Sequence, residues 1–396
     1  MMAVQVLLIA YIAAAFAYWL LVARAMWLVR CRVPRLVDAQ PPEPARWPRL
    51  SVLIPACNEA DRIEPAARTL LAEDYPDLEL VFIDDRSSDA TGAIIDRLAA
   101  EDPRAKAVHI RELPEGWLGK VNALHRGFAE STGELVLLTD ADIHFARGSL
   151  RKAVAYAEAE RLDHLAALPE LLPTSLLVDA VILLFLRQFM TAVRPWAVSD
   201  PRSSAYIGIG AFNLVRREAF AATEGFEWLR METADDMGVG LLMKTSGKRC
   251  GVAGARGYLS LQWYRSLAEA ARGAERGWST VMRFSLVRAI ALALVSLLVQ
   301  ASPVLALVPL LWHDVGPIRY AGIAVTAAFL ASALPLRGWG RRGLWLRAFA
   351  TPLVSPVVAF ALLRAGLLGW RRGGAMWRGT VYPNESLRAG ARVKFP

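Results

Sequence analysis

The sequence predicts an α/β domain with a mainly parallel central sheet, an N-terminal transmembrane anchor before it and membrane helices after it. Its mean hydropathy of +0.32 is high for a chain in which 21% of the residues are charged. Membrane segments and a water-exposed domain in one chain give such values. Long apolar runs lie near both ends, and between them short apolar runs alternate with segments of helical spacing. That alternation is typical of an α/β sheet.

The net charge of +9 limits the class of partner. The arginine clusters flank apolar runs, which favours an anionic lipid surface and disfavours nucleic acid as the partner. The cysteines, Cys31, Cys57 and Cys250, are widely spaced. This spacing predicts neither a disulfide framework nor a zinc site.

Residues 1–30 are predicted to form the transmembrane anchor. The run from residue 4 to 29 carries no charge except Arg24 and is long enough to span a bilayer. Further arginines follow this run, whereas a cleaved secretory signal has its positive charge in front. We therefore expect a retained anchor in the inner membrane, with the amino terminus outside and the next domain in the cytoplasm. Residues 31–49, rich in Pro and Arg, are predicted to be a semi-rigid linker.

Residues 50–285 are predicted to form the water-exposed domain. Buried strands are predicted at residues 50–56, 78–85 and 134–142, and helices at 59–72 and 89–100. This order implies parallel strands with right-handed crossovers, and ligands of such sheets bind beyond the carboxyl ends of the strands. The polar residues that follow these strands should therefore gather at one edge: Glu59, Asp85, Asp140 and Asp142.

Residues 286–370 are predicted to be membrane segments, followed by a basic tail at 371–396. The runs 289–311 and 320–336 are apolar enough to span a bilayer. A third run, 348–370, contains two prolines and an arginine, and its crossing would place the basic tail outside. We therefore expect it to be re-entrant or interfacial. A shorter apolar run, 175–196, fits either core packing or an interfacial helix.

The pair Asp140 and Asp142 is the first candidate for chemistry. Residues i and i+2 of an extended chain lie on the same side, so the two carboxylates repel unless a positive charge lies between them. Mg²⁺ or Mn²⁺ bound to a phosphate would supply that charge, and a solvated turn is the alternative. Asp85 offers acceptor oxygens for a nucleotide at the same edge. The alternative for this segment is a helix cap, supplied by Asp89 or Ser88.

Three further segments carry candidate residues. Lys120 follows Gly119 at a predicted helix start, where it could meet a phosphate or remain solvated. Asp235 and Asp236 precede a helical pattern and could cap it, or supply a general base with a raised pKa. Arg265 lies beside aromatic residues ahead of the membrane, a pattern that suits a diphosphate ligand or a membrane anchor.

Taken in order, the motifs resemble those of the membrane-bound inverting glycosyltransferases of family 2. The motifs are "SVLIPACNE", "FIDDRSSDAT", "GWLGKVNAL", "LLTDAD", "GIGAFNLVRREAFAATEGF", "ADDMGVG" and "QWYRS". They cover residues 50–266. Within the family, their arrangement is similar to the ceramide glucosyltransferase-like enzymes and to the hopene-associated glycosyltransferases.

The resemblance implies a GT-A fold, a nucleotide-sugar donor and a divalent metal, Mg²⁺ or Mn²⁺. It gives each matched residue a role. Asp142 matches the principal metal ligand, with Asp140 beside it. The donor-binding set comprises Glu59, Asp85, Lys120, Asp140, Gln262 and Arg265. Asp236 matches the catalytic base, and Asp235 replaces the usual glutamate. Ser266 stands where the Q-x-x-R-W motif has tryptophan, which puts the role of that position in doubt.

These roles predict transfer of a sugar, with a UDP-sugar as the expected donor, to a hydroxyl of a lipid acceptor. One alternative is a polyprenyl-phosphate glycosyltransferase, whose phosphate acceptor needs less from a base. A processive polysaccharide synthase would need more membrane spans than this chain offers. A non-catalytic membrane protein that binds nucleotide sugars is the alternative from another class.

Overall fold

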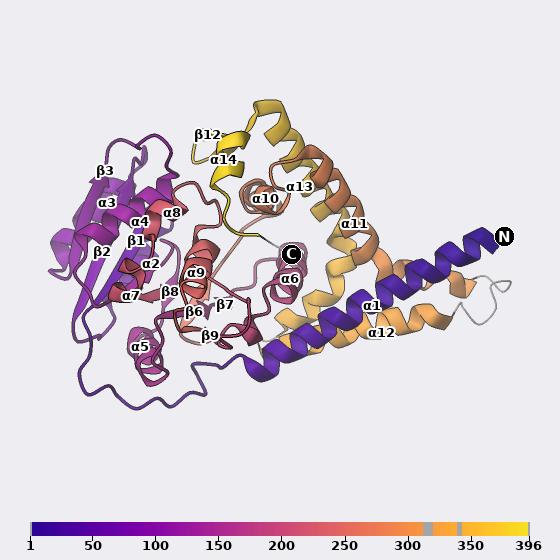
Figure 1. Ribbon diagram of the computed structural model, residues 1–396, viewed down its shortest axis with the longest axis horizontal. Helices are drawn as coiled ribbons and strands as arrows, with labels where there is room; N and C mark the ends of the chain where they lie inside the picture. Colours follow the sequence, from indigo (N-terminus) through magenta and orange to yellow (C-terminus); the bar gives the residue numbers. More distant parts are fainter. Residues whose placement is uncertain (1, 312–319, 339–342, 395–396) are drawn as a thin grey trace.

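The computed structural model describes residues 2–311, 320–338 and 343–394. Figure 1 shows an α/β domain from which a group of helices extends to one side. The central sheet has the strand order β3-β2-β1-β4-β8-β6-β9. Neighbouring strands are parallel except where β8 pairs with β4 and β6. The predicted α/β class with a mainly parallel sheet is therefore confirmed.

The predicted strands are found close to their expected bounds. The sheet comprises β1 (Leu50–Ala56), β2 (Leu78–Asp85), β3 (Ala105–Ile110), β4 (Leu135–Leu138), β6 (His164–Leu168), β8 (Asn213–Arg216) and β9 (Cys250–Gly254). β4 ends at Leu138, before its predicted end at Asp142, because Asp140 lies in irregular backbone and Asp142 in the turn that follows. We call residues 139–142 the β4 turn. β3 was not predicted, because it is an edge strand and its residues are mostly half-buried.

Helices connect and cover the strands. They are α2 (Ile63–Leu71), α3 (Thr91–Glu101), α4 (Gly119–Glu130), α5 (Ser149–Ala159), α7 (Arg217–Ala221), α8 (Gly225–Leu229) and α9 (Asp235–Thr245). A smaller sheet has β5 (His144–Phe145), β10 (Leu259–Leu261) and β7 (Glu170–Leu171). α2 begins later than predicted, because residues 59–62 form a turn in which Arg62 N–H donates to Glu59 O.

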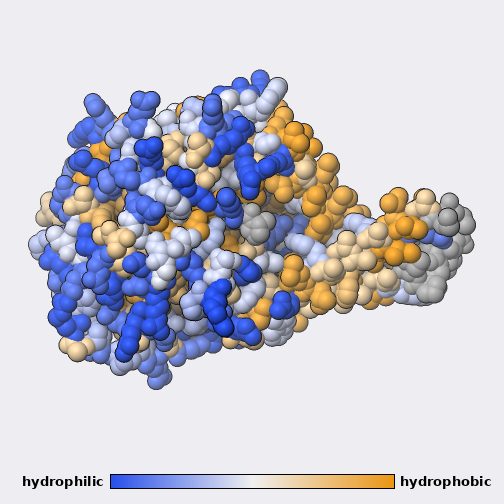
Figure 2. Space-filling model, viewed as in Figure 1, coloured by the Kyte–Doolittle hydropathy of each residue, from blue (hydrophilic) through white to orange (hydrophobic). Residues whose placement is uncertain are grey.

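The remaining helices form the apolar part of the molecule. They are α1 (Met2–Arg32), α6 (Leu176–Val193), α10 (Leu267–Val281), α11 (Leu286–Leu305), α12 (Ala321–Ala333) and α13 (Thr351–Arg372), with short 3-10 turns η1 (Pro195–Ala197), η2 (Val308–Leu311), η4 (Leu334–Gly338) and η5 (Leu344–Ala350). Among the described residues, four helices could cross a membrane by length and composition: 3–32, 176–197, 286–311 and 345–372. Figure 2 shows apolar surface over this part of the molecule.

Two expectations for the membrane segments differ from the structure. The predicted span 320–336 contains α12, which is too short to count among the four candidates, because 3-10 turns replace the helix from Leu334. In the run 348–370, residues 351–370 belong to one continuous helix, α13, with Pro352 in its first turn and Pro356 inside, and residues 348–350 end the 3-10 turn η5. α13 does not reverse direction as a re-entrant segment would, and the other expectation, an interfacial segment, stays a prediction. Residues 312–319 and 339–342 lie outside the described residues.

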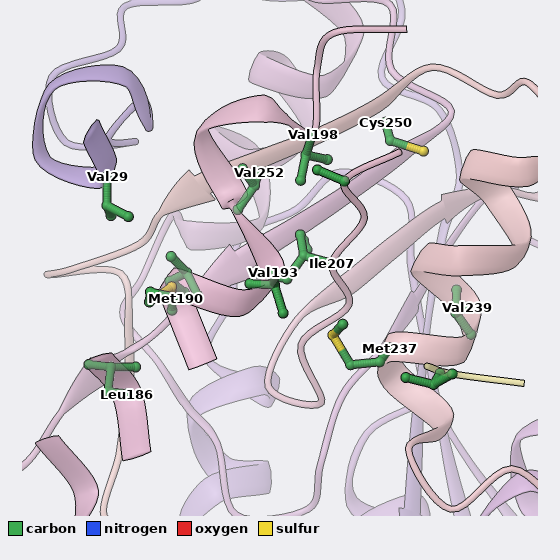
Figure 3. Close-up of a cluster of buried hydrophobic side chains, with 14 of the residues drawn as sticks. Val29, Leu186, Met190, Val193, Val198, Ile207, Met237, Val239, Cys250 and Val252 are labelled. Atoms are coloured by element: carbon green, nitrogen blue, oxygen red, sulfur yellow. The ribbon is translucent and has the colours of Figure 1, made fainter. Parts of the chain in front are cut away.

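One hydrophobic core joins the apolar helices to the α/β domain. Figure 3 shows Val29 of α1 and Met190 of α6 in the same cluster as Met237 of α9 and Val252 of β9. α9 begins with Asp235 and Asp236. The position of these aspartates is therefore coupled by packing to the apolar helices.

The predicted linker 31–49 packs against the domain rather than bridging open space. Leu36 is 1% exposed, and its N–H donates to Gly254 O at 2.8 Å. Trp47 meets Tyr75 edge to face. These contacts fix the path from α1 to β1.

The predicted basic tail also folds back onto the domain. It contains the hairpin β11 (Gly374–Trp377) and β12 (Thr380–Pro383), then α14 (Asn384–Gly390). Figure 1 shows this segment, in yellow, returning beside α10 and the α/β domain. We call residues 374–393 the C-terminal strap.

Candidate active site

The carboxyl ends of β1, β2 and β4 bring the predicted carboxylates to one edge of the sheet. β1 pairs with β2 on one side and with β4 on the other. Asp85 ends β2, and Asp140 and Asp142 follow β4. Glu59, just beyond β1, lies near enough to Asp142 to affect its pKa. The predicted gathering of strand-end residues is present in the structure.

Asp142 occupies a crowded, negatively charged position. Burial, with the charges of Asp140 and Glu59, raises its pKa to about 6. Arg62 opposes this shift and donates to Asp142 Oδ2 at 3.2 Å. The same guanidinium binds Glu269. Lys120 pairs with Asp140 and Arg378 with Glu59, so the four carboxylates outnumber the three cations by one. A further cation would neutralise that remaining negative charge.

Lys120 connects the two acidic groups of the site. Its Nζ lies 2.8 Å from Asp140 Oδ1 and 3.0 Å from Asp235 Oδ2. Burial lowers the pKa of Lys120, but the charges of Asp140 and Asp235 outweigh burial and raise it above its usual value. Lys120 is therefore a permanent cation between the β4 turn and the start of α9.

Asp236 is held by backbone donors instead of a cation. Gly210 N–H donates to Asp236 Oδ2 at 2.9 Å, and Met237 N–H donates to Oδ1 at 2.8 Å. Burial, followed by the charge of Asp235, raises the pKa of Asp236 to about 6. A carboxylate that is fixed in orientation and titrates near neutrality suits a general base.

Two glycines of the "GIGAF" segment are required by close approach to the aspartates. A Cβ on Gly208 would lie 1.7 Å from Asp236 O, and one on Gly210 would lie 2.5 Å from Asp140 Oδ2. Any side chain at either position would displace the acidic groups. This segment therefore sets the spacing between Asp140 and Asp236.

The adjacent aspartates at the end of β2 differ in their partners. Asp84 accepts from Ser87 N–H and contacts His109 Nδ1 at 3.1 Å, which ties it into the fold. Asp85 pairs with Arg86, whose Nε lies 2.8 Å from Oδ1. A Cβ on Gly119 would lie 2.3 Å from Asp85 Oδ2, so the start of α4 lies directly against this carboxylate. These contacts favour a structural role for Asp84 and leave Asp85 at the site.

Gln262 and Arg265 are less directly connected to the cluster. Both are exposed, and Gln262 donates to Thr174 Oγ1 at 3.3 Å. The backbone N–H of Arg265 donates to Glu269, and Glu269 in turn binds Arg62. Arg265 is therefore connected to the Arg62–Asp142 pair only through Glu269. Ser266 is the N-cap of α10 and accepts from Glu269 N–H. A capping role accounts for serine at the position where the family motif has tryptophan.

The donor set fits a divalent cation that arrives with a phosphate ligand. Within residues 2–311, 320–338 and 343–394, no group of three or more His, Cys, Asp or Glu side chains is arranged to hold a metal alone. Mg²⁺ is commonly bound by one or two carboxylates together with substrate phosphates. Asp140 and Asp142 supply two carboxylates, and the excess negative charge at Asp142 favours a cation there.

Several site residues carried no role in the sequence prediction: Arg62, Arg86, Gly208, Gly210, Glu232, Glu269 and Arg378. Gly208 and Gly210 carry a readable signal, because two glycines in three residues ahead of a strand suggest close backbone approach. The arginines carry none, since a chain with many arginines gives no pattern that singles them out.

The comparisons with known proteins concern the part of the chain that builds this edge. Residues 51–169 match the profile of Glycosyl transferase family 2. The chain is 39% identical over 97 residues to Probable glycosyltransferase YdaM of Bacillus subtilis, covering 24% of this chain and 23% of that protein. It is 33% identical over 112 residues to Beta-monoglucosyldiacylglycerol synthase of Synechocystis sp., covering 28% of this chain and 23% of that protein. The match spans about a quarter of the length of each relative.

The fold also resembles a solved structure. Mannosyltransferase PcManGT from Pyrobaculum calidifontis, in complex with GDP-Man and Mn²⁺, superposes with a TM-score of 0.51 at 22% identity. The alignment covers 93% of this chain and 98% of that one. The predicted GT-A-like fold with flanking apolar helices is therefore present.

Proposed function

We propose, from the family 2 glycosyltransferase segment at residues 51–169, that the protein transfers a sugar from a nucleotide-sugar donor to a hydroxyl of a membrane lipid. The configuration at the anomeric carbon would be inverted. The observation that carries this proposal is the division of the site by Lys120. The β4 turn with Asp140 lies on one side of Lys120, and the start of α9 with Asp235 and Asp236 lies on the other.

The donor would lie along the carboxyl edge of the sheet. Asp85 would accept hydrogen bonds from the nucleoside, and Asp140 and Asp142 would hold Mg²⁺ or Mn²⁺ with the diphosphate. The bound cation would supply Lewis-acid stabilisation of the departing diphosphate. Lys120 is charged and adjacent, and would add a second positive charge. A UDP-sugar is the donor we propose, and Gln262 and Arg265 are proposed contacts from the exposed side.

Asp236 would take the proton of the acceptor hydroxyl as its oxygen attacks the anomeric carbon. Gly210 N–H holds one carboxylate oxygen of Asp236, which fixes the direction of that proton transfer. The acceptor would approach from the apolar helices, because α9 shares a core with α1 and α6 (Figure 3). A lipid acceptor and a catalytic domain on the cytoplasmic face of the inner membrane fit this arrangement.

The test is turnover by the purified protein in lipid vesicles. UDP and GDP sugars are offered with Mn²⁺ or Mg²⁺ and separate acceptors: diacylglycerol, a hopanoid, a sphingoid lipid and polyprenyl phosphate. We expect a glycolipid, detected by mass spectrometry, that disappears on chelation and in Asp142→Asn. Asp77→Asn is the control, because Asp77 precedes β2 at the opposite edge of the sheet and its side chain is 53% exposed.

The acceptor panel separates the proposal from its alternatives. A product on polyprenyl phosphate that persists in Asp236→Asn would favour the polyprenyl-phosphate glycosyltransferase. Donor binding with no product on any lipid would favour a non-catalytic nucleotide-sugar-binding protein.

A further inference from the structure

The C-terminal strap places an arginine over the end of β1. β11 and β12 pair from Gly374 with Pro383 to Trp377 with Thr380. The two turn residues, Arg378 and Gly379, have φ of 48° and 80°. A two-residue hairpin turn with both φ values positive favours Asn or Gly at its first position. An arginine there costs roughly 1 kcal/mol of backbone strain. Contacts of the arginine side chain elsewhere in the structure must offset this strain.

The guanidinium of Arg378 reaches the candidate site. It donates to Cys57 O and to the carboxylate of Glu59, residues more than 300 positions earlier in the chain. Arg62 joins Glu59 to Asp142, because its backbone N–H donates to Glu59 O at 2.9 Å and its guanidinium donates to Asp142 Oδ2 at 3.2 Å. Arg378 is therefore next to the carboxylates that would hold the metal.

The strand order shows where Arg378 lies relative to the donor-binding residues. β1 lies between β2 and β4, so the end of β1 lies between Asp85 and the pair Asp140 and Asp142. A nucleoside at Asp85 whose diphosphate reaches a metal at Asp142 must cross the end of β1. Arg378 stands at that crossing, and a guanidinium binds phosphate oxygens in a bidentate manner.

The strap is fixed at two points that follow Arg378 in the chain. Tyr382 is 9% exposed and lies beside Gly119, which itself contacts Asp85. Farther along, the N–H groups of Arg392 and Val393 donate to Glu232 Oε2 at 2.5 and 2.9 Å. An arginine anchored in this way loses little freedom on binding a ligand.

We propose that Arg378 is a ligand of the donor diphosphate and that the C-terminal strap forms one wall of the donor site. The assignment rests on the proposed function. On donor binding, the guanidinium exchanges part of its contact with Glu59 for phosphate oxygens. The strap thus belongs to the site and is not a solvated basic tail.

The test compares nucleoside diphosphates with nucleosides on the full-length protein in Mn²⁺. Binding of UDP, GDP, uridine and guanosine is measured for the wild type, Arg378→Gln, Arg378→Lys and Arg371→Gln. Arg371→Gln is the matched control, because Arg371 is exposed and lies just before the strap. We expect Arg378→Gln to weaken diphosphate binding about tenfold to hundredfold. Nucleoside binding should be unchanged, and Arg378→Lys should recover part of the loss.

Limited proteolysis and the thermal midpoint show whether the strap stays folded in each variant. Equal losses of diphosphate and nucleoside binding in Arg378→Gln would indicate a structural role and overturn the assignment. Unchanged diphosphate binding in that variant would overturn it as well. A wild-type protein that binds no nucleoside diphosphate would instead overturn the proposed function, and this assignment with it.

Discussion

The two sides of the site are built in different ways. The proposed donor side, with Glu59, Asp85, Asp140 and Asp142, comes from strand ends within residues 50–142. The proposed base side combines α9 with the glycine segment at 208–210, and the C-terminal strap connects it to the donor side, because the strap binds Glu232 before α9 and Glu59 after β1. The first is encoded by a local pattern, and the second by long-range packing. Local motifs therefore identify the donor side more completely than the base side.

The two sides also differ in how their charges are balanced. On the donor side each aspartate faces a cation: Asp85 with Arg86, Asp140 with Lys120 and Asp142 with Arg62. On the base side Asp236 accepts from the N–H groups of Gly210 and Met237. Ion pairs can exchange partners when a metal and a diphosphate arrive, whereas the backbone donors remain in place. The donor side is suited to ligand exchange, and the base side to fixed orientation.

The largest expected effect tests the fixed base. Asp236→Asn keeps the size of the side chain but removes the proton acceptor, so kcat should fall about 10²–10⁴-fold. Donor binding, measured by titration with UDP, should stay within about twofold. A near-normal kcat would contradict the assignment of Asp236 as the base. The catalytic group would then belong to the donor side.

The pH profile sharpens the same point. Because the pKa of Asp236 is raised to about 6, the base loses its charge below that pH. At saturating Mn²⁺ and donor, log kcat should fall with a slope near one below about pH 6 and be level above. The residual activity of Asp236→Asn should lack this limb. A limb that moves with metal concentration would instead belong to Asp142.

A third prediction tests the dependence of the site on the strap. Glu232 is fully buried, and its carboxylate accepts N–H bonds from Ala234, Arg392 and Val393. Glu232→Gln replaces one acceptor oxygen by a donor, which should cost about 1–3 kcal/mol of unfolding free energy. The strap should become sensitive to protease, and the donor KM should rise because Arg378 is no longer held. Unchanged donor KM with a released strap would show that the strap is dispensable.

The smallest effect tests the scaffold of the donor side. Asp96, followed by Asp84, raises the pKa of His109. A raised folded-state pKa stabilises the fold fully below the unfolded value of about 6.5, and the contribution is lost as pH rises through the folded value. Thermal midpoints of wild type and His109→Gln should therefore differ more at about pH 6 than at about pH 9. An equal difference at both would exclude the charged pair as the cause.

The sequence predicted for a physical reason that strand-end carboxylates gather at one edge of the sheet. In parallel strands the carboxyl ends meet at one edge, so β1, β2 and β4 place Glu59, Asp85 and Asp140 together without further information. Lys120 and Asp235 were each predicted to act at the site, but their direct contact was not predicted. That contact depends on the packing of α4 and α9, and helical spacing does not determine it.

The contacts of the strap could not be predicted from the sequence. Net positive charge at 371–396 predicted a basic tail, and charge composition does not specify where a chain returns. The same holds for Gln262 and Arg265, whose motif predicted donor contacts while the structure ties Gln262 to Thr174. Hydrogen bonds between residues far apart in the chain produce no periodic pattern of residue types in the sequence.

The strap also limits how many times the chain could cross a bilayer. Its contacts with Glu59 and Glu232 hold residues on both sides of α11, α12 and α13 in one folded body. An odd number of crossings between residues 286 and 373 would put those partners on opposite faces of the membrane. The three helices therefore cannot each cross once. A reporter attached beyond the strap would reveal which compartment contains the sugar donor.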